Sequence, residues 1–219
     1  MKRNFALLVL FIVLVADLPL HAHTINYAME TKPAGHVFNF YTGMGFTHIL
    51  PWGYDHLLFI LGIFLLNPNL KPLLTQATCF TLAHSITLIL TANGTIVSIP
   101  SIVEPLIAIT ILFIAVENLY IKNISRLRYI LVFAFGLVHG MGFAGALNEV
   151  GLPRNSFYTA LIGFNIGVEL GQIVFILAIF FTIGYFRKHN WYREAITIPL
   201  SLGIALVALW WSIERIIYN

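Results

Sequence analysis

Long apolar runs separated by short polar connections dominate the chain after its first 45 residues. Six of these runs come near the twenty or so apolar residues that are needed to cross a bilayer core. They cover residues 46–66, 72–93, 101–121, 128–147, 156–185 and 196–214. The pattern predicts an all-α fold, a polytopic transmembrane helix bundle of about six spans that occupies residues 46–219.

The first 22 residues have the three-part plan of a secretory signal peptide. Lys2 and Arg3 precede an apolar run over residues 5–15, and Ala22 then offers a cleavage site. An uncleaved membrane anchor is the alternative, because Leu20 is not the small residue preferred three positions before the cut. Residues 23–45 would then form an extracytoplasmic N-terminal segment.

Composition supports a membrane protein and excludes two other classes. The 219 residues are 59% hydrophobic and 10% charged, whereas a soluble domain is about a quarter charged. The net charge of +3 comes without a run of basic residues interleaved with aromatics, so a nucleic-acid partner is excluded. The single cysteine, Cys79, leaves no disulfide framework. The expected surroundings are a lipid bilayer.

Loop charges predict the orientation of the spans. With residue 23 outside, positive residues concentrate in the cytoplasmic connections, as is usual for inner-membrane proteins. These residues are Lys71, Lys122, Arg126, Arg128, Arg187, Lys188 and Arg193, against Lys32, Arg154 and Arg215 outside. We therefore expect a multi-pass protein of the inner (plasma) membrane whose mature N-terminus lies outside.

Several ionisable side chains share a depth within these spans. At about 1.5 Å of rise per residue, they fall in the outer half or at the midplane of four different helices. They are His48, Asp55, His56, His84, His139 and Glu169. Such residues cost several kcal/mol inside a bilayer, so they indicate a functional site for a metal or a proton. Taken singly, each histidine could be a hydrogen-bonded helix contact, and Glu169 a structural partner of an Asn or Thr.

Imidazole and carboxylate groups together suit a divalent transition metal ion, with nickel, cobalt and zinc as candidates. Asn165, Glu169 and Gln172 follow i, i+4, i+7 spacing and should form a polar stripe on one helix face, with Asn165 and Gln172 as secondary polar lining of the site. Pro51 and Gly53 lie between His48 and Asp55 and should break or kink the first span.

Three more polar residues are assigned less firmly. Glu104 lies near the outer end of the third span, where it would line an entrance or simply begin the helix, a position that favours a carboxylate. Glu117 and Asn118 lie towards the cytoplasmic end of the same span. They would mark an exit path if the protein is a transporter, or serve as ordinary interface residues.

Four stretches resemble one family of membrane proteins. HILPWGYDHLLFILGIFLL, FTLAHSITL, VHGMGFAGAL and FNIGVELGQ are similar to motifs of the HupE/UreJ family, in the same order, between about residues 44 and 175. The resemblance implies a nickel or cobalt permease, or an accessory protein that works with the maturation machinery of hydrogenase or urease. It also implies that His48, Asp55 and His56 form the metal-recognising signature. His84, His139 and Glu169 would complete the path.

The signature departs from the family pattern at one point. Six residues separate His48 from Asp55, whereas five are usual in the family signature, and the extra residue falls beside Pro51. Either a kink absorbs it, or His48 lies outside the coordination shell of Asp55 and His56.

Three functions follow from these residues. The first is secondary transport of the metal from outside to inside, without ATP hydrolysis because no GxxxxGK[ST] motif occurs. The second is an intramembrane hydrolase, in which His56, His84 and His139 hold zinc and either Asp55 or Glu169 acts as general base. The third is a non-transporting accessory protein. Glu117 and Asn118, below the cluster, favour transport.

Overall fold

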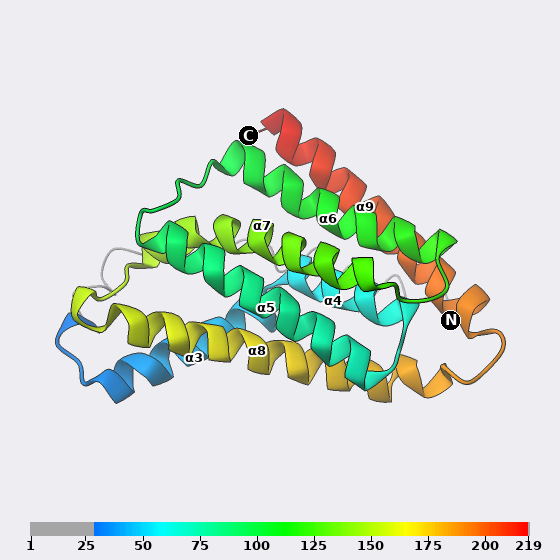
Figure 1. The fold of residues 1–219 in the computed structure, drawn as a ribbon, viewed down its shortest axis with the longest axis horizontal. Coiled ribbons are helices and arrows are strands. Elements are labelled where there is room, and N and C mark those ends of the chain that lie inside the picture. Colours follow the sequence, from blue (N-terminus) through cyan, green and yellow to red (C-terminus); the bar gives the residue numbers. More distant parts are fainter. Residues whose placement is uncertain (1–28, 219) are drawn as a thin grey trace.

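The computed structural model describes residues 29–218, without the side chains of residues 144–146 and 148–150 (Figure 1). This part of the chain is all helical and contains no strand, which confirms the predicted fold class. Its α-helices are α3 Ala34–Ile49, α4 Tyr54–Leu66, α5 Leu70–Ala92, α6 Pro100–Tyr120, α7 Arg126–Val150, α8 Phe157–Phe181 and α9 Ile198–Tyr218. Shorter turns of helix are η1 Arg154–Ser156, η2 Ile183–Phe186 and η3 Arg193–Thr197. The predicted signal peptide lies outside the described residues.

Five of the helical segments are long and apolar enough to cross a membrane. They are Leu70–Ala92, Pro100–Tyr120, Arg126–Phe143, Arg154–Phe181 and Arg193–Tyr218. A sixth span is formed if α3 and α4, which meet at 64°, are counted as one broken crossing. The chain is therefore a polytopic membrane protein, and each of the last five predicted runs corresponds to one of these segments.

The first predicted run, 46–66, differs from the structure because it is not one helix. Helix already begins at Ala34, and the chain breaks between Ile49 and Tyr54 before α4 starts. Pro51 has no N–H to donate, and its ring disfavours helix in the preceding turn, so the break falls where Pro51 and Gly53 predicted it. The start at Ala34 was missed because α3 mixes polar residues and glycines with its apolar positions.

Glycines allow two pairs of helices to approach unusually closely. α3 runs parallel to α8, and a Cβ added at Gly167 would lie 2.0 Å from the carbonyl oxygen of Thr42. α5 runs parallel to α7, where a Cβ at Gly140 would lie 2.2 Å from the carbonyl oxygen of His84. Small residues permit such backbone contact between membrane helices. α6 and α9 form a third, antiparallel pair.

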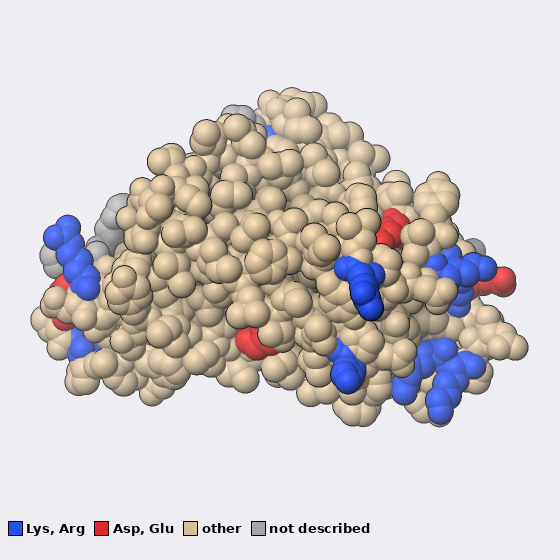
Figure 2. Space-filling model, in the orientation of Figure 1, with Lys and Arg blue, Asp and Glu red and all other residues tan. Residues whose placement is uncertain are grey.

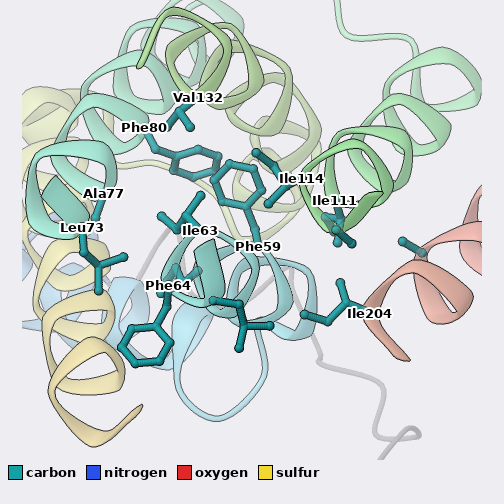
Figure 3. Packing of buried hydrophobic residues seen from close by; sticks show 14 of the residues in the cluster. Phe59, Ile63, Phe64, Leu73, Ala77, Phe80, Ile111, Ile114, Val132 and Ile204 are labelled. Carbon is teal, nitrogen blue, oxygen red and sulfur yellow. The ribbon is translucent and has the colours of Figure 1, made fainter. Parts of the chain in front are cut away.

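The short helix α4 lies in the middle of the bundle and carries much of its core. Eight of its thirteen residues are buried, and it contacts α5, α6, α8 and α9. A helix that is apolar on all sides is expected to be buried on all sides. Figure 3 shows Phe59 of α4 next to Phe80 of α5, with Ile63 and Ile114 close by.

Most lysines and arginines gather at one end of the bundle (Figure 2). We call this the basic end; it comprises Lys71, Lys122, Arg126, Arg187, Lys188 and Arg193. α5, α7 and α9 begin there, and α4, α6 and α8 end there. α3 and α8 begin at the opposite end, so the broken α3–α4 segment runs from that end to the basic end (Figure 1).

Candidate metal site

Four histidines from four helices meet beside the break between α3 and α4. The ring of His56, in the first turn of α4, lies at the centre of the group. Its centroid is 4.8 Å from that of His48, 5.7 Å from that of His84 and 5.3 Å from that of His139. His56, His84 and His139 are at most 2% exposed. The 64° bend between α3 and α4 allows His48 to join this cluster despite the extra residue beside Pro51.

Asp55 fixes the orientation of the neighbouring His56 ring. Its Oδ1 atom accepts hydrogen bonds from the backbone N–H of His56 at 2.8 Å and from His56 Nδ1 at 2.9 Å. A carboxylate only accepts, so Nδ1 carries the hydrogen and Nε2 carries the lone pair in the neutral ring. Nε2 is buried and has no hydrogen-bond partner among the described residues. A carboxylate behind a histidine is the usual outer partner of a metal-binding imidazole.

Thr110 of α6 fixes the tautomer of His139 in the same way. The Thr110 hydroxyl donates its single hydrogen to the carbonyl oxygen of Ile107 at 2.7 Å. It can therefore only accept from His139 Nε2, which lies 2.9 Å from the hydroxyl oxygen. The lone pair of His139 is then on Nδ1, a buried atom that has no partner within residues 29–218.

The other two histidines also present ring nitrogens without partners. Both ring nitrogens of His84 and Nε2 of His48 are buried and unbonded in the described chain. Buried polar atoms in native proteins are nearly always hydrogen-bonded, and leaving one unsatisfied costs about 1–3 kcal/mol. Imidazole nitrogens that carry a lone pair can bind a transition metal ion, so the chemistry of this cluster fits a metal site.

The geometry of three of these side chains suits one ion. Ligand atoms of Asp55, His56 and His139 all lie within 4.8 Å of one another. Nitrogen and oxygen ligands about 2.1 Å from a shared ion lie up to about 4.2 Å from one another. The three side chains would therefore have to move only slightly closer together to bind one ion. His48 and His84 are neighbours of His56 and could provide further ligands.

A cavity of about 190 Å³ gives access to the cluster. Its polar lining residues are His48, Asp55, His56 and His139 of the cluster, together with Glu104 and Arg215. The remaining lining residues are Ile107, Gly142 and Phe143. Glu104 lies near the start of α6 and Arg215 near the end of α9, so the cavity extends towards the end opposite the basic end.

The stripe predicted on α8 faces α5, and the residues that line the cavity beside the histidines come from other helices. Oε1 of Glu169 accepts a hydrogen bond from Thr78 at 2.9 Å. Asn165 accepts one from Ser85 at 2.6 Å, and Gln172 one from Thr81 at 3.3 Å. Glu169 shares the depth of the histidines, and its Oε2 atom is buried without a hydrogen-bond partner among the described residues. These three residues join two helices.

Glu117 and Asn118 belong to a buried network near the basic end. The guanidinium of Arg128, which is fully buried, forms an ion pair with Glu117. It also donates to Gln76 at 3.1 Å and to Asn118 at 3.4 Å. Asn118 in turn donates to the carbonyl oxygen of Gly62 at 2.8 Å. The network ties together α4, α5, α6 and α7 and fills the position at which an exit was expected.

Sequence reasoning missed two residues of the site, Thr110 and Arg215. Thr110 is a polar residue in the middle of an apolar span, and its depth could have paired it with His139. Arg215 lies close to the C-terminus and resembles an ordinary interface residue, so no local signal connects it with the cluster.

Comparison with known proteins identifies the family of this chain. No curated protein and no solved structure shows a match to it. The family described as HupE / UreJ protein matches residues 24–215, which is nearly the whole sequence. The four motifs and the histidine cluster lie within that match, and the chain belongs to the HupE/UreJ family.

Proposed function

We propose that the protein carries a divalent transition metal ion across the membrane. The recognition site is the cluster of His48, Asp55, His56, His84 and His139. The observation that supports it best is the set of buried imidazole nitrogens that have no partner among the described residues, contributed by α3, α4, α5 and α7. An ion that enters the cluster would replace missing hydrogen bonds with coordination bonds, at a depth where water is scarce.

Nickel or cobalt is the proposed substrate. Imidazole nitrogens bind late first-row divalent metals well, and a carboxylate offsets part of the charge. The same ligands also suit zinc, so the choice of nickel or cobalt rests on the resemblance to the HupE/UreJ permeases rather than on the ligand set. We place the protein in the inner membrane with its basic end in the cytoplasm, since basic loops favour that side.

Transport is supported by the asymmetry of the site, which a cavity opens towards one end of the bundle and packed side chains close towards the other. The cavity reaches the cluster from the end opposite the basic end. Towards the basic end, the ring of Phe59 lies beside that of Phe80 (Figure 3), with 4.8 Å between their centroids. Both rings also contact His139. The Arg128 network lies beyond them. The ion would enter from outside, and its release inwards would require these layers to separate.

The zinc-hydrolase alternative needs a general base, and the two carboxylates considered for that role have other contacts. Oδ1 of Asp55 already accepts two hydrogen bonds from His56. Glu169 is bonded to Thr78 at the contact between α5 and α8. A general base must reach the attacking water beside the metal. These contacts give both carboxylates a structural role, and together with the cavity that opens on one side they favour transport.

Uptake into proteoliposomes tests the proposal. Vesicles containing the purified protein should accumulate radioactive nickel or cobalt above the level of empty vesicles, and His56→Gln should lose this uptake. Glu169→Gln serves as a matched control because its amide oxygen can still accept from Thr78. Equal accumulation in empty and protein-containing vesicles would exclude transport. Metal binding without accumulation would indicate an accessory protein instead.

A further inference from the structure

Arg215 is a fixed positive charge in the wall of the cavity that holds the metal ligands. It lines this cavity together with Asp55, His56 and His139. A site for a bare cation gains nothing from a guanidinium group, because the two positive charges repel each other. The position of Arg215 therefore needs a reason other than attraction of the ion itself.

Two contacts hold the guanidinium of Arg215 in place. Its Nη1 donates to the carbonyl oxygen of Glu104 at 3.1 Å, and its Cζ lies 5.4 Å from the centre of the Trp211 ring. Within the described chain this hydrogen bond uses only part of the guanidinium, since an arginine has several N–H donors in a planar fork. The remaining N–H donors can form charge-assisted hydrogen bonds to a carboxylate oxygen.

The cavity has room for more than an ion. Its volume of about 190 Å³ corresponds to about six water molecules at about 30 Å³ each. An ion coordinated directly by His56 and His139 would fill a small part of this space. A ligand of a few heavy atoms would fit between the ion and Arg215.

We propose that the site takes the metal as a complex with a small amino- or hydroxy-carboxylate. The ion binds the imidazole nitrogens, and the carboxylate of its ligand accepts hydrogen bonds from Arg215. Such a ligand chelates through one carboxylate oxygen and the neighbouring amine or hydroxyl, which leaves its second carboxylate oxygen for the guanidinium. This inference rests on the proposed metal site and names the form in which that site receives its substrate.

Co-retention of nickel and glycine tests the inference, with glycine as the smallest amino-carboxylate probe. Purified protein is incubated with radioactive nickel and glycine carrying a second label, then separated from free ligand. The wild type should retain about one glycine for each nickel ion, and none without nickel. In Arg215→Gln the ratio of glycine to nickel should fall about tenfold or more, the scale of one charge-assisted hydrogen bond. Arg154→Gln, an exposed arginine near the same end of the bundle, is the matched control.

Three results distinguish this inference from the proposed function. Nickel retained by the wild type without labelled glycine would overturn the inference and leave the metal site standing. The same would follow if glycine only competes for nickel, equally in wild type and Arg215→Gln. Nickel that is not retained at all, or is retained unchanged by His56→Gln, would overturn the metal site and the inference with it.

Discussion

His139 donates its Nε2 hydrogen to the hydroxyl oxygen of Thr110, 2.9 Å away, and so keeps its Nδ1 lone pair for a ligand. Asp55 has the corresponding effect on His56, where Nε2 is the atom that remains available. The two imidazoles come from different helices and use different ring nitrogens. Their arrangement depends on outer partners that hold each ring in one tautomer.

Thr110→Val should weaken metal binding because valine has a similar shape but cannot accept the hydrogen of His139 Nε2. The expected loss is about 10- to 100-fold in nickel affinity, the range found for outer-shell partners of metal-bound histidines. Isothermal titration calorimetry of the purified protein measures it. Thr110→Ser retains the hydroxyl and should bind nearly as well as the wild type. A valine variant with unchanged affinity would show that Thr110 does not orient the ligand.

Asp55→Asn and Glu169→Gln should distinguish the roles of these two carboxylates, which share a depth, in metal binding. Asp55→Asn removes the negative charge behind His56 and should lower nickel affinity by about tenfold or more. Glu169→Gln should leave affinity within about twofold of the wild type, since Glu169 contacts Thr78 of α5. Equilibrium dialysis with radioactive nickel gives both values. A large loss for Glu169→Gln would place that carboxylate in the coordination shell.

The depth of each polar residue along its span could be predicted from the sequence, but the direction in which its side chain points could not. His48, Asp55, His56, His84 and His139 lie at similar depths, and the structure brings them together. Glu169 has the same depth but belongs to the contact between α5 and α8. Depth follows from counting residues at a constant rise, whereas facing depends on how each helix is rotated against its neighbours.

The helix packing was less predictable for a different reason. Pro51 and Gly53 indicated a break, yet the size and direction of the bend come from tertiary contacts. α3 mixes polar residues and glycines with its apolar positions, so residues 34–45 were assigned to the extracytoplasmic N-terminal segment. Its buried face, with Val37, Tyr41 and Gly45, packs closely on α8 because α8 has glycines at the contact. Close contact between backbones is a property of a helix pair, which no single segment displays.

Gly167→Ala should destabilise the protein because its Cβ would lie 2.0 Å from the carbonyl oxygen of Thr42 and 2.7 Å from the backbone nitrogen of Phe46. Backbone atoms cannot move aside as a flexible side chain can, so we expect a loss of about 1–3 kcal/mol or more. Gly43→Ala is the control, since its Cβ meets nothing within 4 Å. Thermal unfolding in detergent compares the two variants. Equal midpoints would contradict the close packing of α3 against α8.

Glu117→Gln should also destabilise the protein, because it removes the charge that compensates the fully buried Arg128. Removing one partner of a buried ion pair costs about 3–5 kcal/mol. Glu194→Gln, at an exposed position of the same basic end, should change stability by less than about 0.5 kcal/mol. The free energy of unfolding from denaturant titration checks both variants. If the two behave alike, the network does not hold the basic end together.

X-ray absorption spectroscopy of the nickel-loaded protein tests most directly whether the histidine cluster is the metal site. The spectrum should show the scattering pattern of at least two imidazole rings, with nitrogen ligands at about 2.1 Å. This pattern should be lost in the His56→Gln, His139→Gln double variant. Nickel surrounded by oxygen ligands alone in the wild type, or an unchanged spectrum in the double variant, would contradict the account.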